Sequence, residues 1–493
     1  MSCIILTLDQ STSATKAVLF DARGKVLDKA SKAHRQIYPQ PGWVEHDAEE
    51  IWKNVLAVIS EIAGRNPKKI SKLAGLSISN QRETVVVFDR KTGRPLHNAL
   101  VWQDRRGTAI CGALTKQGHS PNVLRKTGLK IDTYFSASKL RWLIENKPAI
   151  AAKLRDGTAV IGTIDTYLIH RLTRGKVFAT DFTNASRTLL FDIGKLKWDA
   201  PLCKLFKVPM SALPEVRESA SHFGETDADG ILPKQISIVG VMGDSQASLF
   251  AQRCYKPGTA KATFGTGTSV LLNIGDTLRV SERGAVTALA WVVNGKPTYA
   301  FEGIINFSAA TIEWLKNQLG LIQNASEVES LAMRVADNGG VYLVPAFAGL
   351  SAPHWSPDAR AAIVGMTAFT QREHIIRAAQ EAIAYQIRDV LDMMRTDSKI
   401  KLASLHADGG PTRNKFLMQF TADLTRTEIK VAEVAESSAW GAAMNGLLGL
   451  GICNSLDELA TLPRESSNYK PAMSLLNAKH LHDGWITAVK RVL

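Results

Sequence analysis

The chain has 493 residues, of which 45% are hydrophobic and 22% are charged, and its formal net charge at pH 7 is +14. This length exceeds what a single hydrophobic core supports, so we expect at least two domains. Basic residues are spread in short clusters without interleaved aromatic residues, which argues against a nucleic-acid partner. No apolar run has the length of a membrane span, and the 5 cysteines are scattered. We therefore expect a cytoplasmic protein without a membrane partner or a disulfide framework.

The first predicted element is a strand, a turn rich in hydroxyl groups, and a second strand, at residues 4–8, 9–16 and 17–20. The same pattern returns half a chain later, where the turn at residues 265–269 lies between strands at 261–264 and 270–272. Such patterns predict β-hairpins, although an ordinary turn explains either one alone equally well. Backbone N–H groups and hydroxyls in such turns can bind phosphate oxygens. As a pair, the hairpins predict a clamp on the phosphates of a nucleotide between two domains. A P-loop motif is absent.

Strand-like and helical patterns alternate along both halves of the chain. The strand-like runs are residues 70–79, 85–88 and 159–161. The helical patterns are residues 51–64 and 137–145 in the first half, and residues 373–394 and 414–424 in the second. This alternation predicts mixed α/β layers. We expect an N-terminal domain at residues 1–245 and a C-terminal domain at residues 246–493.

A carboxylate, Asp244, follows the apolar run at residues 236–242. In a turn after a buried strand, Asp244 could take a proton from a substrate hydroxyl, as phosphoryl transfer requires. The alternative is that Asp244 caps a helix at residues 246–252. Position alone favours the cap, because helices often begin with Asp.

Three further groups of residues have two interpretations each. Arg82 and Glu83 lie between apolar strands, where they could bind a polyol or form a surface ion pair. Trp102 and Tyr134 could form the wall of a substrate pocket or belong to the core. The turn at residues 408–410, followed by Asn414, could receive an adenosine or be structural.

Together these segments resemble the FGGY family of carbohydrate kinases, in particular its members that phosphorylate glycerol. The likeness covers nearly the whole chain and includes residues 36–39, 42–46, 80–84, 101–103, 183–188 and 408–410. Residues 134–143 resemble one family signature, and residues 361–366 with 374–377 resemble the other. Gln380 departs from the second signature, which has an apolar residue at that position.

The resemblance implies an α/β fold of two actin-like (hexokinase-like, ribonuclease H-type) domains around an interdomain cleft. It also implies ATP and Mg²⁺ as cofactors, and phosphorylation of a terminal hydroxyl of a small polyol, with glycerol giving glycerol 3-phosphate. We expect a homo-oligomer, either a dimer or a tetramer. Two alternatives stay open: a kinase for a polyol or ketose of four or five carbons, and a catalytically silent sugar-binding protein. Retention of Asp9, Asp244 and both hairpins argues against the silent protein.

The resemblance also assigns roles to individual residues. Asp244 matches the general base, and Asp9 matches a magnesium-associated carboxylate. The polyol-binding positions are Arg82, Glu83, Trp102, Tyr134, Asp244, Ser245 and Ser269. The nucleotide-binding positions are Thr12, Ser13, Ala14, Lys16, Thr266, Ala309, Gly410 and Asn414.

Several of these positions differ from the members that phosphorylate glycerol. Ser245 replaces a glutamine and Ser269 replaces a phenylalanine, so a polyol larger than glycerol stays open as the substrate. In the nucleotide site, Ser11 and Ala309 replace glycines, and Lys16 replaces an arginine. Residues 226–233 are acidic and lack the arginine that binds fructose 1,6-bisphosphate in bacterial members. We therefore expect no inhibition by that compound.

Overall fold

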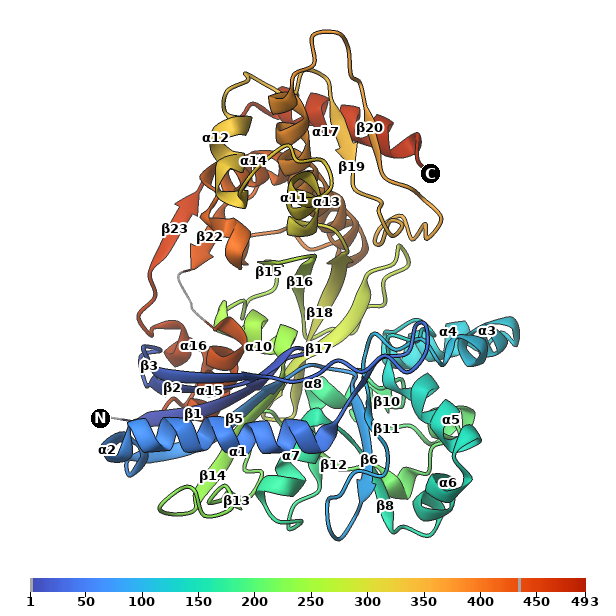
Figure 1. The fold of residues 1–493 in the computed structure, drawn as a ribbon, viewed down its shortest axis with the longest axis vertical. Helices are drawn as coiled ribbons and strands as arrows, with labels where there is room; N and C mark the ends of the chain where they lie inside the picture. Colours follow the sequence, from blue (N-terminus) through green and yellow to red (C-terminus); the bar gives the residue numbers. More distant parts are fainter. Residues whose placement is uncertain (1–2, 433–435) are drawn as a thin grey trace.

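The computed structural model describes residues 3–432 and 436–493, which form two halves, each built on its own β-sheet (Figure 1). The sheet of the N-terminal half has six strands in the order β13-β14-β5-β1-β2-β3. These strands are β1 (Ile4–Gln10), β2 (Ala14–Asp21), β3 (Val26–Ala33), β5 (Leu73–Asn80), β13 (Glu225–Thr226) and β14 (Ile236–Gly243). β1, β5 and β14 are parallel neighbours, whereas β1, β2 and β3 form an antiparallel meander.

The sheet of the C-terminal half repeats this arrangement in the order β17-β18-β16-β15-β21-β22-β23. Its strands are β15 (Thr259–Phe264), β16 (Thr268–Gly275), β17 (Val286–Val293), β18 (Lys296–Ile305), β21 (Ser404–Asp408), β22 (Ile429–Ala432) and β23 (Ser466–Tyr469). β15, β21 and β22 are parallel neighbours, and β15, β16 and β18 are antiparallel. The expectation of α/β layers with a hairpin at the start of each half is confirmed.

The predicted helices are present; three have slightly longer bounds, and the fourth, α14, is shifted by one residue. They are α1 (Ala48–Arg65), α5 (Ser136–Asn146), α13 (Arg372–Ser398) and α14 (Lys415–Thr425). In α1 the side chain of Asp47 accepts a hydrogen bond from Glu49 N, and one face including Ile51, Val55 and Ile62 is buried. This amphipathic pattern packs α1 against β2 and β3.

The N-terminal half also contains a four-stranded sheet of β4 (Glu45–His46), β6 (Val85–Asp89), β7 (Ala99–Leu100) and β8 (Ala159–Thr163). Its other elements are α2 (Pro67–Ile70), α3 (Thr108–Lys116), α4 (Ser120–Thr127), α6 (Pro148–Arg155), α7 (Ile164–Leu172), β9 (Ala179–Asp181), α8 (Phe182–Ala185), β10 (Phe191–Asp192), β11 (Lys197–Trp198), α9 (Ala200–Leu205), β12 (Glu215–Arg217) and α10 (Asp244–Ala251). The C-terminal half adds α11 (Ala309–Asn317), α12 (Val328–Ala332), β19 (Tyr342–Val344), β20 (Ala362–Val364), α15 (Ser437–Gly449), α16 (Leu456–Ala460) and α17 (Leu475–Lys490). Among the described residues, no helix is long and apolar enough to cross a membrane.

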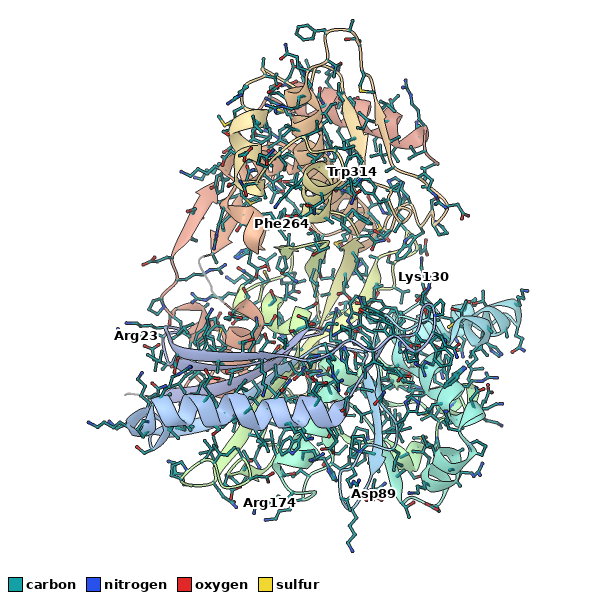
Figure 2. The ribbon with its side chains drawn as sticks, viewed as in Figure 1. Arg23, Asp89, Lys130, Arg174, Phe264 and Trp314 are labelled. Carbon is teal, nitrogen blue, oxygen red and sulfur yellow. The ribbon has the colours of Figure 1, made fainter. Side chains whose placement is uncertain are left out.

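The two halves share a core, although each has its own sheet. α15 packs on β14, β5 and β1 of the N-terminal sheet and on α10. A Cβ at Gly441 would lie 1.8 Å from Ala247 O, so a glycine is needed for this close approach. A second connection is a cation–π contact, in which Lys130 Nζ lies 4.0 Å from the centroid of the Trp355 ring. Figure 2 shows Lys130 beside the middle of the molecule, far from Arg174 and Asp89 at its lower end.

Candidate active site

The candidate site begins where three parallel strands of the N-terminal sheet end. In the register of β1, β5 and β14, Gln10 and Gly243 both pair with Asn80. The turn after β1, the segment after β5 and the start of α10 after β14 therefore meet at one edge of the sheet. Ligands of open α/β sheets bind at this edge, beyond the carboxyl ends of the strands.

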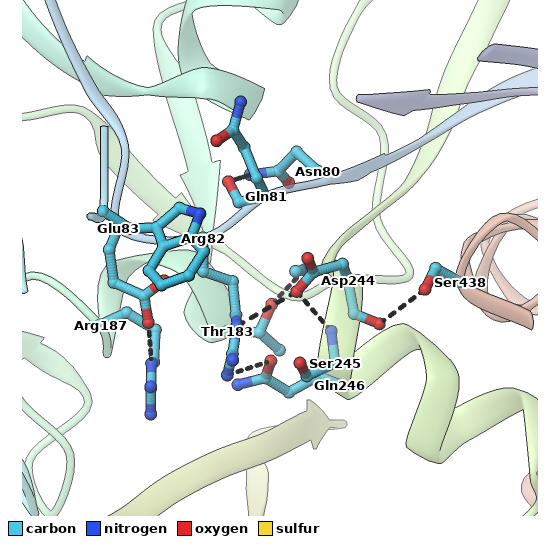
Figure 3. Close-up of polar contacts among 12 residues, drawn as sticks. Asn80, Gln81, Arg82, Glu83, Thr183, Arg187, Asp244, Ser245, Gln246 and Ser438 are labelled. Carbon is cyan, nitrogen blue, oxygen red and sulfur yellow. Dashed lines mark hydrogen bonds and ion pairs between the residues drawn. The ribbon is translucent and has the colours of Figure 1, made fainter. Parts of the chain in front are cut away.

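Asp244 is the first residue of α10, and it does not cap that helix. The N-cap residue is Gly243, and no side chain makes a capping hydrogen bond to α10. The interpretation of Asp244 as a helix cap, which its position in the sequence favoured, is therefore wrong. The helix α10 begins two residues earlier than expected. Asp244 Oδ1 lies 3.2 Å from Arg82 Nε and accepts a hydrogen bond from Ser245 N at 2.6 Å (Figure 3). Its side chain is 37% exposed, so a substrate can reach the carboxylate.

Arg82 and Glu83 belong to a buried network of four charged side chains. Arg82 Nη2 lies 2.7 Å from Glu302 Oε1, and Arg187 Nη1 lies 2.9 Å from Glu302 Oε2. Arg187 Nε donates to Glu83 Oε1 at 2.6 Å. All four side chains are at most 5% exposed, so the interpretation as a surface ion pair is wrong. Glu302 lies on β18, and the network therefore joins the two halves of the molecule.

The charged groups of this network shift one another's pKa values. Burial alone would raise the pKa of Glu302, but Arg187 and Arg82 outweigh it and lower that pKa to about 2. Burial raises the pKa of Glu83, and Arg187 and Arg82 oppose this rise. Burial would lower the pKa of Arg82, but Glu302, Glu83 and Asp244 raise it well above its ordinary value. Arg82 therefore stays charged beside Asp244.

Trp102 and Tyr134 lie together next to this network, with ring centroids 5.2 Å apart. Both side chains are only half-buried, and Tyr134 also packs against a hydrophobic core cluster of the N-terminal half. The indole Nε1 of Trp102 donates to Thr12 Oγ1 at 2.9 Å and so connects this wall to the first hairpin. Burial raises the pKa of Tyr134, which keeps its hydroxyl protonated.

The two serines at the altered polyol positions lie on separate elements. Ser245 follows Asp244 in α10 and is half-buried. Ser269 lies in β16, and its buried hydroxyl has no hydrogen-bond partner among the described residues. A buried hydroxyl without a partner costs free energy, which a ligand or a water molecule can recover.

The first hairpin places two expected residues opposite each other, because Asp9 pairs with Lys16 in the register of β1 and β2. Lys16 Nζ lies 3.9 Å from Asp9 Oδ2 and donates to Glu436 Oε2 at 2.7 Å. Burial is the main cause that raises the pKa of Asp9 to about 6, and Lys16 opposes the rise. Thr12 and Ser13 form the turn, and the Ser11 hydroxyl accepts from Ala14 N at 3.2 Å.

A carboxylate such as Asp9 suits magnesium in a nucleotide site. Among the described residues, no group of three or more His, Cys, Asp or Glu side chains could hold a metal ion. Mg²⁺ in phosphoryl-transfer enzymes is typically held by one or two carboxylates together with substrate phosphates. The donor set at Asp9 therefore fits an ion that arrives with a nucleotide.

The second hairpin turns at residues 265–267 and rests on the start of α11. Ala309 N and Ala310 N donate to Gly265 O and Thr266 O at 3.0 and 3.1 Å. These contacts occupy the N–H groups that would otherwise be free at the helix end. The exposed Thr266 side chain and Ala309 lie together at the junction of hairpin and helix.

A cavity of about 460 Å³ lies beyond this junction, and it brings together Ala309, Gly410 and Asn414. The two glycines of the neighbouring turn have different roles. A Cβ at Gly409 would lie 1.9 Å from Phe264 O, so Gly409 serves the packing of β21 on β15. A Cβ at Gly410 would meet nothing within 4 Å, so this position is open towards a ligand. Asn414 caps α14, where its Oδ1 accepts from Leu417 N at 2.8 Å.

Sequence reasoning gave no role to four residues of this region: Arg187, Glu302, Glu436 and Lys261. Lys261 is buried in β15, where its Nζ donates to Thr263 Oγ1 at 2.9 Å, and burial lowers its pKa. A lysine inside an apolar strand is a signal that the sequence did offer. Glu302 and Glu436 gave no comparable signal, because their partners are hundreds of residues away.

The acidic stretch at residues 226–233 lies outside the site. Arg174 Nη2 lies 2.7 Å from Asp227 Oδ1, and Arg174 Nε lies 3.6 Å from Asp229 Oδ1. The acidic stretch is therefore paired with an arginine in the turn that follows α7. The sequence did not reveal this pairing. The expected insensitivity to fructose 1,6-bisphosphate stays a prediction.

Comparisons with known proteins agree over the full length. The profile of the FGGY family of carbohydrate kinases, N-terminal domain, matches residues 4–251, and that of its C-terminal domain matches residues 260–450. Glycerol kinase 1 of Thermotoga maritima is 45% identical over 489 residues, covering 99% of each chain. Glycerol kinase of Desulfitobacterium hafniense is 44% identical over 493 residues, covering 100% of each chain.

Among solved structures, that of Plasmodium falciparum glycerol kinase with ADP superposes with a TM-score of 0.95 at 39% identity. The match covers 100% of this chain and 98% of that one. Together with the repeated sheets, it confirms the two-domain actin-like fold. The chain belongs to the FGGY family of carbohydrate kinases.

Proposed function

We propose that this protein is an ATP-dependent glycerol kinase, which phosphorylates a terminal hydroxyl of glycerol to give glycerol 3-phosphate. The observation that carries the proposal is the contact between Asp244 and Arg82. It sets an exposed carboxylate against a buried, permanently charged arginine, at 3.2 Å. The glycerol kinases that share about 45% of the sequence over its whole length support the same activity.

The residues of the N-terminal half bind and orient the polyol. Arg82 donates to one hydroxyl of glycerol and Glu83 accepts from another, while the rings of Trp102 and Tyr134 cover the carbon chain. Asp244 accepts the proton of the terminal hydroxyl that is to be phosphorylated. The ion pair with Arg82 holds the carboxylate in place for this transfer.

ATP with Mg²⁺ supplies the phosphoryl group when it is bound. Thr12, Ser13, Ala14 and Lys16 of the first hairpin and Thr266 of the second would hold its phosphates, and Asp9 would hold the magnesium ion. Ala309, Gly410 and Asn414 surround the adenosine in the cavity of about 460 Å³. Lys16 neutralises negative charge on the transferred group, and closure of the two domains excludes water.

These binding roles are divided between the two proposed domains. Residues 1–245 bind the polyol and carry the first phosphate hairpin, and residues 246–493 carry the second hairpin and the adenosine site. Glu302 is the exception, because it reaches from the second domain into the polyol side of the first. A cytoplasmic location and a dimeric or tetrameric assembly remain predictions from the sequence.

A kinase for a longer polyol is the second candidate, and the Ser269 hydroxyl is the observation that favours it. This hydroxyl is buried without a partner among the described residues, as it would be if an additional substrate hydroxyl were to bind there. A coupled assay of ADP release over polyols and ketoses of three to six carbons decides between the candidates. We expect the highest kcat/KM with glycerol. Turnover that is absent with every polyol and ketose would contradict the proposed function.

A further inference from the structure

The cavity assigned to adenosine is mainly apolar, and its walls come from four helices. Ile312 of α11, Val328 of α12, Ile383 of α13 and Leu417 of α14 line it. These apolar side chains cover the faces of a flat ring but cannot distinguish one base from another. The polar residues that also line the cavity are Glu313, Ser326, Glu329, Arg413, Asn414 and Gln380. Recognition of the base edge requires a polar side chain in this wall.

Gln380 of α13 is a polar residue in this wall with no assigned partner. It lines the cavity and is 1% exposed. Neither Oε1 nor Nε2 of its carboxamide has a hydrogen-bond partner among the described residues. A buried amide without partners is costly, and native proteins satisfy nearly all such groups. A ligand or a water molecule in the cavity that Gln380 lines can supply the partner.

Other polar side chains of α13 show that the helix does satisfy its buried amides and charges elsewhere. Gln386 Nε2, almost two turns further along, donates to Phe307 O at 3.1 Å and to Ala382 O at 3.2 Å. Glu381, next to Gln380, is held by Arg377 Nε at 2.8 Å and by Asn338 Nδ2 at 3.0 Å. Arg395 Nε also lacks a partner, but Arg395 bonds through its Nη2 to Thr425 O. Gln380, which lines the cavity, is the residue of α13 whose amide oxygen and nitrogen both lack a partner among the described residues.

A carboxamide presents an acceptor beside a donor in one plane. Adenine is complementary to it, since its 6-amino group donates next to a ring nitrogen that accepts, and glutamine pairs with adenine in this way elsewhere. We propose that Gln380 binds this edge of the adenine ring, through the 6-amino group and the adjacent nitrogen, and so determines the base preference. This inference rests on the proposed use of ATP.

The proposal predicts opposite effects on binding and on stability. Gln380→Met keeps the length of the side chain but removes the amide. It should weaken ADP binding about tenfold, the typical worth of a bidentate pair with a base. The same change should raise the melting temperature of the nucleotide-free protein slightly, because an unsatisfied buried amide is lost. A purely structural role for Gln380 would lower the melting temperature and leave the affinity unchanged.

The test measures ADP binding by calorimetry, without polyol, in the wild type, Gln380→Met and Gln386→Met. Purine riboside 5′-diphosphate, which lacks the 6-amino group, is the second ligand. The wild type and Gln386→Met should prefer ADP over this analogue, and Gln380→Met should bind both alike. Gln380→Leu repeats the test if Gln380→Met does not fold.

The outcomes separate this inference from the proposed function. If ADP binding depends on Gln380 but no polyol is phosphorylated, the inference stands and the proposed function fails. If glycerol is phosphorylated and Gln380→Met keeps the preference for ADP over the analogue, the inference alone is overturned. Absence of ADP binding in the wild type would overturn both.

Discussion

The polyol side and the nucleotide side of the site differ in how their polar groups are satisfied. Arg82, Glu83, Arg187 and Glu302 already pair with one another at 2.6–2.9 Å. In the nucleotide cavity, by contrast, the amide of Gln380 has no partner among the described residues. The charged network of the polyol side is therefore preorganised, as electrostatic catalysis requires. The Ser269 hydroxyl at the polyol side and the Gln380 amide in the nucleotide cavity are left for a ligand or a water molecule to satisfy. Changes on the polyol side should affect stability and catalysis together, and changes at Gln380 should separate them.

The largest effect on activity is expected at Asp244. Its carboxylate is partly exposed and contacts Arg82 of the buried charged network. Asp244→Asn removes the proton acceptor but keeps the shape of the side chain. We expect kcat to fall by a factor of ~100 to 10,000, the usual contribution of general-base catalysis. ADP affinity, measured by calorimetry, should be nearly unchanged. A variant that keeps more than about a tenth of the wild-type rate would show that Asp244 is not the base.

Glu302 tests whether the buried network is needed. Glu302→Gln leaves Arg82 and Arg187 with only one carboxylate of the network, and removing one partner of a buried pair typically costs about 3–5 kcal/mol. We expect the free energy of unfolding, measured by chemical denaturation, to fall by roughly that amount, and the KM for glycerol to rise.

The matched control for Glu302 is Glu61→Gln. Glu61 pairs with Arg65 on the surface of α1, and both side chains are more than 40% exposed. Exposed pairs contribute at most about 1 kcal/mol, so this variant should remain close to wild type. Equal effects of the two substitutions on stability, with an unchanged KM for Glu302→Gln, would show that the network has no special role.

Substitutions at Ser245 and Ser269 should have a smaller effect, on the choice between polyols. The double substitution Ser245→Gln with Ser269→Phe adds bulk beside the carbon chain and removes the unpartnered Ser269 hydroxyl. We expect the ratio of kcat/KM for glycerol to that for erythritol to rise in the double variant. An unchanged ratio, or a wild type that ignores erythritol and has a micromolar KM for glycerol, would rule out an enlarged pocket.

The contribution of Asp9 to stability should depend on pH. Because burial raises its pKa to about 6, the folded protein holds this proton more tightly than the unfolded chain. The stabilisation is complete below the ordinary Asp pKa and is lost as the pH rises through about 6. Its charged form therefore destabilises the ligand-free protein by about 3 kcal/mol at pH 8.

The variant Asp9→Asn removes that charge. In thermal unfolding without ligand, it should melt a few degrees above the wild type at pH 8, with a smaller difference at pH 5. Lys16, Asp244, Ser79 and Glu436 also act on the Asp9 carboxyl and are the same in both proteins. A melting difference that grows as the pH falls would contradict the raised pKa.

Much of the site could be predicted because its signals are local. The hairpins and the run before Asp244 are short apolar patterns, and β1 and β14 end at one edge of the N-terminal sheet. The role of Asp244 in its helix was mispredicted, since a cap and a first-turn residue look alike in sequence. Glu302 lies 220 residues from Arg82, and Glu436 lies 420 residues from Lys16, so no local pattern reveals either pair. Gln380 was visible as a departure from a family signature, but only the fold shows that it is buried at the cavity.

The most direct test of the central claim is the stoichiometry of product formation. Purified wild-type protein is incubated with ATP, Mg²⁺ and glycerol, and both ADP and glycerol 3-phosphate are quantified. We predict that the two products form in equal amounts and that ADP formation depends on glycerol. ADP release that is independent of glycerol, or the absence of glycerol 3-phosphate, would contradict the account.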